Sequence, residues 1–580
     1  MANASAAGGD RRVDARVDVD CRRGRGTLRR IWSSFGYDEI NWTCTPQGRR
    51  HLETMRALME VPYTVRAHNL YTSGTGRGLP HFGSGNVYHE DAGGAVRCDW
   101  SLLHAVFDAW VGAGCRPIVE LGFCPKALVP ESAALAFTPM PSVYSPYEAG
   151  QWAWPPRDLR RWHDLVADTV RHGLQRYGRD VVGTWSWELW NEPDIFYWKG
   201  TAQEYHRLYD VTVAAVTGLL PEARVGGPAT TGGGAAFLEG FLAHCAAGTN
   251  AVTGRRGTRL DFVSFHTNGA SFRPWRVYGP LGPDGVETAE RASPSTAKML
   301  REIRTGLAAV AGHPEFAALP VLVDECDASV PAHWGVYDNG NFAYRNTEYY
   351  PVFQAQLMKK LLDMDGLSLA RVDAATTWSW YMEGDRYFEG TRNLFTAGGI
   401  PTPLLNAYRL LGRLPGQRLH VESDRGRALA QLDRDEDATV PEVDALAAAD
   451  AGRPGAPAGA GGQAGGTGAR LAVAVWHHCD DQYRRGAAEV TVTVRGLPFA
   501  GRPGVLRHFR IDATHSNSHS AWVAAGRPQD PGPDEVAGIA ARSGLERCGE
   551  DVAYDHMPED VEVRLTLPLP GVSLLEWEAV

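Results

Sequence analysis

Two glutamates at distant positions in the chain stand in settings that favour acid–base and nucleophilic chemistry. Glu192 lies in the segment Trp187–Asp194 (WELWNEPD), and Glu325 ends the apolar run Leu322–Glu325 (LVDE). Both follow short apolar runs of the kind that form buried strands. Cleavage of a glycosidic bond requires two carboxyl groups, because one must be protonated to release the leaving oxygen while the other, ionised, attacks or stabilises the anomeric carbon.

Each glutamate taken alone also has a structural explanation. Glu192 precedes Pro193 at an expected helix start, where a carboxylate interacts favourably with the helix dipole. Glu325 could equally be the partner of an ion pair. Because the two stand at matched strand ends, among tryptophan and histidine residues, the pair favours a functional interpretation that neither supports alone.

The elements that must position these residues alternate between apolar runs and longer amphipathic stretches from about residue 30 to 410. The expected strands are Ile31–Gly36, Val61–His68, Arg116–Leu121, Val181–Trp190, Ala223–Gly227, Leu260–His266, Pro320–Glu325 and Ala374–Trp380. Each is followed by a helical pattern, and near-continuous apolar runs are typical of parallel strands covered on both faces. Eight such units predict an α/β fold, a closed (β/α)₈ TIM barrel over residues 27–411, with an open doubly wound sheet as the alternative.

In a barrel of this kind, functional groups gather at the carboxyl ends of the strands. Besides the two glutamates, several polar and aromatic residues fall at these ends. They are Arg66, His68, Glu120, Asn191, His266, Asp324, Trp378 and Trp380. These residues are therefore expected to lie around one mouth of the barrel.

After about residue 412 the hydrophobic period changes to two, as in Val490, Val492 and Val494. Short strands are expected at Arg418–Glu422, Ala428–Leu432, Leu471–His477, 490–494, Val505–Ile511, 561–567 and Val572–Trp577. This pattern predicts an additional C-terminal β-sandwich domain over residues 412–580, interrupted by a Gly/Ala/Pro-rich loop at 452–468. In the N-terminal segment, residues 1–26, Val13, Val17 and Val19 alternate with polar residues and are expected to add a strand to that sandwich.

Composition excludes several classes of function. The net charge of −10, with 58 basic against 68 acidic residues, lacks the clustered basic surplus of a nucleic-acid-binding protein. No apolar run is long enough to span a bilayer, and the first residues lack the apolar core of a secretion signal, so we expect a cytoplasmic protein. The nine cysteines form no CxxC pair, and no histidine group has zinc-finger spacing, so neither a metal nor a cofactor is expected.

The motifs also carry a family resemblance. WELWNEPD is similar to the Asn-Glu-Pro signature of clan A glycoside hydrolases. The segments VRAH (65–68), VELGFCPK (119–126), VGGPA (225–229), DFVSFH (261–266) and LVDE (322–325) follow the order seen in glycoside hydrolase family 39, which contains β-xylosidases and α-L-iduronidases. RIDATHSNSHSAW (510–522) resembles part of the C-terminal sandwich of that family.

The resemblance implies that Glu192 is the acid/base and Glu325 the nucleophile of a retaining enzyme, and Asn191 is placed to hydrogen-bond the sugar 2-hydroxyl. His68, His266 and Arg66 are expected to line the glycone subsite, with a buried histidine or a structural ion pair as the alternative. Trp380 is expected to stack on a sugar face, or else to fill the barrel mouth. A carboxylate contacting sugar hydroxyls is expected at Glu389, although the chain departs from xylosidases over residues 381–390.

These observations lead to one expected function and two alternatives. We expect a retaining exo-glycoside hydrolase, a β-D-xylosidase acting on short xylo-oligosaccharides, whose partner is that substrate and neither nucleic acid nor membrane. The alternative within the family is an α-L-arabinosidase, a galactosidase or an iduronidase-like enzyme. The alternative of another class is a non-catalytic carbohydrate-binding protein, against which the two intact glutamates argue. The oligomeric state and the role of the sandwich are left open.

Overall fold

The computed structural model describes residues 13–74, 84–131, 151–272, 291–330, 332, 334–367, 370–378, 380, 386–450 and 469–579. The low-complexity segment 452–468 therefore lies outside the described residues. Among the described residues, no helix is long and apolar enough to cross a membrane.

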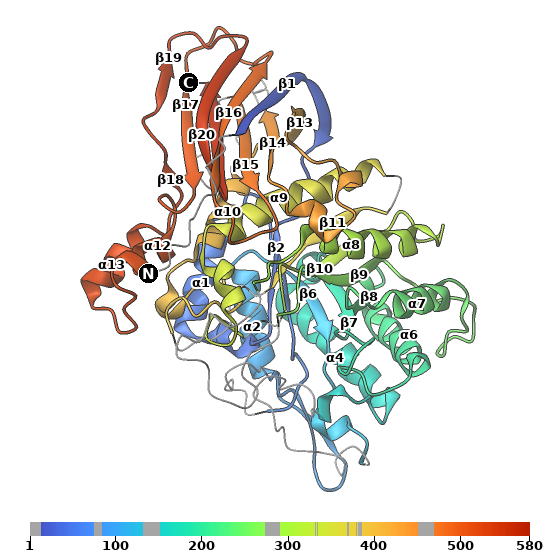
Figure 1. Cartoon of the computed structure of the whole chain (residues 1–580). Helices are drawn as coiled ribbons and strands as arrows, with labels where there is room; N and C mark the ends of the chain where they lie inside the picture. The colour runs from blue at the N-terminus through green and yellow to red at the C-terminus, as the bar shows by residue number, and fades with distance from the viewer. Residues whose placement is uncertain are drawn as a thin grey trace, which may run out of the picture.

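A closed parallel barrel forms the larger part of the molecule (Figure 1). Its strands are β2 (Ser34–Tyr37), β3 (Thr64–Ala67), β6 (Arg116–Leu121), β7 (Ser186–Leu189), β8 (Arg224–Thr230), β9 (Phe262–Asn268), β10 (Val321–Asp327), β11 (Val372–Ala375) and β12 (Thr377–Trp378). The last two are halves of one strand position: β11 pairs with β10, and β12 pairs with β2. That final pairing closes the sheet, so the predicted (β/α)₈ barrel is confirmed and an open sheet is excluded.

Helices follow the barrel strands in alternation. They are α1 (Pro46–Arg56), α2 (Ser101–Gly112), α4 (Leu159–Tyr177), α5 (Arg179–Val182), α6 (Ala202–Leu219), α7 (Ala235–Ala247), α8 (Thr296–Ala311), α9 (Tyr349–Asp363) and α10 (Pro403–Gly412). Local sequence sets several of their starts, since Asp158 caps α4 and Thr201 with Glu204 forms a capping box on α6. Short 3-10 helices lie at Ile40–Cys44, Lys126–Leu128, Gln151–Ala153, Gly340–Asn346, Met364–Gly366, Ala397–Gly399 and Leu429–Gln431, and a small hairpin joins β4 (Tyr88–Glu90) to β5 (Val96–Cys98).

A second, mixed sheet is built from the two ends of the described chain (Figure 1). Its strands are β1 (Val13–Thr27), β13 (Gln417–Ser423), β14 (Glu442–Asp450), β15 (Arg470–His478), β16 (Gly486–Arg495), β17 (Gly504–Ile511), β18 (Glu546–Arg547), β19 (Val552–Tyr554), β20 (Val561–Leu569) and β21 (Gly571–Ala579). β1 lies between β13, to which it is antiparallel, and β16, to which it is parallel. β15 and β20 are far apart in the strand order yet contact each other, so the sheet folds back on itself into the layers of a β-sandwich.

Three local predictions differ from the structure. The expected strand Ala428–Leu432 contains a 3-10 helix, Leu429–Gln431, and the expected strand Val181–Trp190 begins only at Ser186, because Val181 belongs to α5. The strand β14 was not predicted, since its alanine-rich sequence EVDALAAAD has little intrinsic preference for a sheet. Burial against both neighbours stabilises it instead.

A helical pair joins the sandwich to the barrel. α12 (Ser518–Ala524) and α13 (Pro533–Ala541) lie between β17 and β18 in the chain (Figure 1). An apolar cluster of Phe388, Ile400, Trp522 and Ile539 packs these helices against the barrel loop that follows β12.

Candidate active site

A buried arginine on β3 organises the side chains at the carboxyl ends of the barrel strands. The guanidinium of Arg66 lies 2.6 Å from Glu188 of β7, 3.0 Å from Glu120 of β6 and 3.5 Å from Asp324 of β10. It also donates a 3.0 Å hydrogen bond to the Asn191 side-chain oxygen. The Arg66 guanidinium thus links side chains of β3, β6, β7 and β10 at the base of the site.

Glu325 contacts this cluster and is surrounded by basic side chains. Its Oε1 is 3.3 Å from His68 Nε2, 3.5 Å from Arg66 Nη1 and 3.7 Å from His266 Nδ1, and its Oε2 is 4.0 Å from Arg392 Nη2. The pairing of β10 with β9 is irregular between Val323 and Cys326. Such irregularities redirect side chains, and here the two consecutive carboxyls at positions 324 and 325 both reach the same guanidinium.

Glu192 has fewer partners and an unusual backbone. It adopts φ 43°, in the left-handed region, and its amide donates to the Ala229 carbonyl at 2.9 Å. Its Oε1 is 3.0 Å from His266 Nδ1. α6 begins only at Ala202, so Glu192 is not at a helix start, and interaction with a helix dipole does not explain this residue.

The pKa values of the two glutamates are shifted in opposite directions. Burial raises the pKa of Glu192 above its ordinary value, and the charge of Glu325 adds to this increase against the opposing effect of His266. Burial also disfavours ionisation of Glu325, but His266, His68 and Arg392 outweigh it and hold the pKa of Glu325 far below its usual range. The site therefore combines a carboxyl whose pKa is shifted toward the protonated form with one whose pKa is shifted strongly toward the carboxylate.

The shared histidine also limits the separation of the two carboxyls. His266 Nδ1 lies 3.0 Å from Glu192 Oε1 and 3.7 Å from Glu325 Oε1, so these two oxygens are at most about 6.7 Å apart, the sum of the two distances. Retaining glycosidases hold their carboxyls about 5–5.5 Å apart, and inverting ones about 6.5–9.5 Å. The upper bound of about 6.7 Å is close to the lower limit of the inverting range, and the whole retaining range lies below it.

His68 and Asn191 complete the surface of the site. His68 Nδ1 is 2.6 Å from Glu120 Oε2. Burial alone would lower the pKa of His68, but the carboxylates of Glu120 and Glu325 raise it to about 10, so His68 is a cation beside Glu325. The bond from Arg66 to the Asn191 oxygen orients the amide so that its nitrogen, a donor, is on the opposite side.

Two of the predicted substrate contacts are core residues in the structure. Arg66 and Trp380 are both 0% exposed. Arg66 lies beneath Glu325 as a structural ion pair, and Trp380 packs against the rings of Phe35, Tyr37 and His51. This burial favours the structural alternative for each residue over a contact with the sugar.

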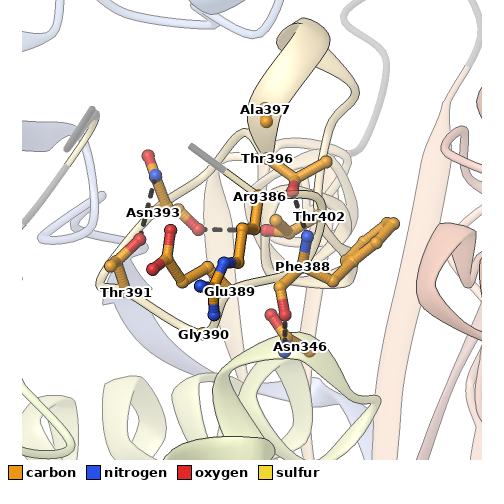
Figure 2. Close-up of a pocket in the computed structure, with 10 residues that line it drawn as sticks. All are labelled: Asn346, Arg386, Phe388, Glu389, Gly390, Thr391, Asn393, Thr396, Ala397 and Thr402. Carbon is orange, nitrogen blue, oxygen red and sulfur yellow. Dashed lines mark hydrogen bonds between the residues drawn. The ribbon is translucent and has the colours of Figure 1, made fainter. Parts of the chain in front are cut away.

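Glu389 lies in the loop that follows β12. It lines a small pocket formed by the loop after β12 together with Asn346, as Figure 2 shows. None of the residues lining that pocket is Glu192, Glu325 or one of their histidine neighbours. The structure thus brings together Asn191, Glu192, His68, His266 and Glu325, and places Glu389 in a neighbouring pocket.

Several functional residues were not singled out as site residues from sequence. Asp324 and Glu188 are buried charged groups inside apolar strands, and a charged residue within such a run is a signal that the sequence contains. Burial and the charge of Glu188 raise the pKa of Asp324 well above its usual range. Arg392 lies in an irregular loop with no periodic pattern. Its Nη1 donates a 2.6 Å hydrogen bond to Asp327, which fixes it beside Glu325.

Removing the central cation should destabilise the barrel. We expect Arg66→Met to lower the free energy of unfolding by about 3–5 kcal/mol, because it leaves the carboxyls of Glu120, Glu188 and Asp324 buried without their counter-ion. Urea unfolding followed by tryptophan fluorescence would measure the change, with the exposed Arg207→Met on α6 as the control. An unchanged unfolding midpoint for Arg66→Met would contradict the organising role of this arginine.

Among the described residues, no group of three or more His, Cys, Asp or Glu side chains is arranged to hold a metal ion.

Comparisons with known proteins show which family the sequence matches. The family model described as glycosyl hydrolases family 39 matches residues 16–543. A β-xylosidase from Geobacillus stearothermophilus is 26% identical over 416 residues, which cover 69% of this chain and 72% of that protein. The human α-L-iduronidase is 26% identical over 437 residues, 70% of this chain but only 57% of that longer protein.

Solved structures share the fold. A monomeric β-xylosidase from Caulobacter crescentus matches with a TM-score of 0.72 and 22% identity, covering 97% of this chain and 99% of that one. A family 39 enzyme from Xanthomonas axonopodis matches with a TM-score of 0.74 and 21% identity over 100% of both chains. At these identities the matches establish the architecture of barrel and sandwich.

Proposed function

Because this chain belongs to glycosyl hydrolases family 39 and is therefore a glycosidase, we propose that it is a retaining exo-acting enzyme, a β-D-xylosidase of short xylo-oligosaccharides. One observation carries the proposal: two carboxyls within about 6.7 Å of each other, one bearing a raised pKa and the other a strongly lowered one. That difference supports Glu192 as the acid and Glu325 as the nucleophile.

The proposed reaction has two displacements. The Glu325 carboxylate attacks the anomeric carbon while Glu192 gives its proton to the leaving glycosidic oxygen, which forms a covalent glycosyl ester. Glu192, now a carboxylate, then removes a proton from water. That water attacks the same carbon, and Glu325 leaves as a carboxylate.

The neighbouring residues have supporting roles in this proposal. His266, which contacts both glutamates, responds to the change in charge as the proton leaves Glu192. His68 and Asn191 offer donors to the sugar hydroxyls, and Asn191 is placed for the 2-hydroxyl, where a hydrogen bond strengthens in the transition state. Glu389 would contact a sugar only if substrate reaches the neighbouring pocket.

Similarity favours a xyloside as the substrate. Two relatives with matched lengths are β-xylosidases, from Geobacillus stearothermophilus and Caldicellulosiruptor saccharolyticus, each 26% identical and covered over more than 70% of its length. A specific observation also supports a second candidate, a uronate glycosidase. The guanidinium of Arg392, 4.0 Å from Glu325, is a cation at the site that could face a sugar carboxylate.

A panel of aryl glycosides separates these candidates. We expect the β-D-xyloside to be cleaved with the highest kcat/KM, ahead of the α-L-arabinoside, the β-D-galactoside and the α-L-iduronide. Preferential cleavage of the iduronide would replace the first candidate with the second. Proton NMR of the first-formed sugar should show retained configuration, and an inverted anomer would remove the nucleophilic role from Glu325.

A further inference from the structure

A second cavity lies at the opposite end of the barrel from the glutamates. Its volume is about 410 Å³, and it is lined by the amino ends of the strands and the segments that precede them. Arg116, the first residue of β6, and Thr64, the first residue of β3, are register partners on its wall. A cavity of this size accommodates a small organic molecule.

The cavity contains a cation whose charge is not neutralised by a contact. Arg116 is exposed, and within the described ranges its side chain has no hydrogen bond or ion pair. Arg224, the first residue of β8, is close enough that the Arg116 charge, after the effect of burial, lowers the pKa of its guanidinium. The two cations repel each other, with Asp261 and Asp373 opposing the effect on Arg224, and an anion beside Arg116 would reduce this repulsion.

A second arginine lining the cavity is incompletely bonded. Arg30 donates through Nη2 to the Leu414 carbonyl at 2.9 Å. Its Nη1 has no hydrogen bond in the described structure and forms a long ion pair with Glu60 Oε1 at 3.7 Å. Arg30 thus lines the cavity as a cation whose charge is only weakly matched.

The carboxylate that lines the same cavity does not cancel these charges. Asp373 already accepts from Arg29 at 3.1 Å and from Arg371 at 3.0 Å, so its charge is matched by other arginines. The remaining lining is mixed, with apolar Leu28, Ile31 and Ala374 beside the hydroxyls of Ser33 and Thr64. The cavity wall therefore combines cationic, apolar and hydroxyl groups.

We propose that this cavity is a binding site for a small molecule carrying an oxyanion, a phosphate or a carboxylate, held by Arg116 and Arg30. Arginine suits this role because its planar fork binds two oxygens of such a group at once. The site is separate from the reaction, since Arg116 begins the strand whose carboxyl end contributes Glu120. It also touches both connections between the barrel and the second sheet, at Thr27–Leu28 and at Gly416.

Calorimetric titration of the full chain tests the proposal with three probes: inorganic phosphate, glucose 6-phosphate and citrate, each compared with sodium chloride at equal ionic strength. We expect at least one probe to bind and to raise the melting temperature. Tighter binding of glucose 6-phosphate than of phosphate would identify an organic phosphate as the ligand. Tighter binding of citrate would identify a carboxylate.

Variants of Arg116 test whether the probe binds in this cavity. Arg116→Gln should weaken binding about tenfold, as loss of a charge-assisted contact does, and Arg116→Lys should weaken it less. Arg207→Gln, an exposed arginine on α6, is the matched control and should leave binding unchanged, and none of the three should alter aryl glycoside hydrolysis. No binding beyond that of chloride, or equal affinity in Arg116→Gln, would overturn the proposal.

Discussion

Glu325→Ala should reduce kcat on an aryl xyloside by roughly 10⁴-fold, in the range seen when a catalytic nucleophile is removed. The reason is that this carboxylate lies beside the cations of Arg66, His68 and Arg392, which favour its ionised form, so the variant lacks the group that attacks the anomeric carbon. Initial rates at saturating substrate measure the loss. Glu325→Gln, which preserves shape but not charge, should be equally inactive.

Azide provides the decisive control for Glu325→Ala. A small anion that enters the vacated space should restore part of the turnover and yield a glycosyl azide of inverted configuration. The same azide should not accelerate the native enzyme. Rescue that gives only free sugar of retained configuration would contradict the nucleophilic assignment.

Glu192→Ala should show a loss that depends on the leaving group. We expect kcat/KM to fall about 10²–10⁴-fold for xylobiose, whose leaving alcohol needs a proton, and far less for an aryl xyloside with an acidic phenol. Comparing a series of aryl xylosides of graded phenol pKa measures this dependence. Equal losses across the series would exclude Glu192 as the acid.

The pH profile provides a second measurement on the same variant. The acid must be protonated, and the pKa of Glu192 lies above its ordinary value, so native activity should persist above the usual range of a glutamate and fall as pH rises through that pKa. In Glu192→Ala, with an acidic phenol as leaving group, this basic limb should disappear. If activity of this variant still falls at high pH, the fall arises from the titration of another group.

Much of the architecture was predictable because apolar runs and helical periods repeat eight times over the barrel. Strand-end position was also enough to bring His68, His266, Glu192 and Glu325 together, since parallel strands end on one side of a barrel. The position of a residue along a strand does not, however, indicate how deeply its side chain is buried. Arg66 and His68 are two residues apart, yet Arg66 is wholly buried among carboxyls while His68 reaches the site.

Residues in loops, and strands whose sequences have little preference for a sheet, could not be predicted in this way. Trp380 follows a two-residue strand, and its indole turns into the core between Phe35 and His51, which no periodicity indicates. Arg392 is held by Asp327, a contact between distant residues. The alanine-rich β14 forms through its two neighbours, and its own residues favour a sheet only weakly.

The position of β1 has a consequence for how the chain matures. This strand precedes the barrel in the chain, but both strands that flank it come from residues beyond 416, after the whole barrel. During translation the barrel can close while residues 13–27 still lack both hydrogen-bonding neighbours. The second sheet can be completed only after its last strand, β21, has left the ribosome, so its completion follows that of the barrel and depends on contacts of very large sequence separation.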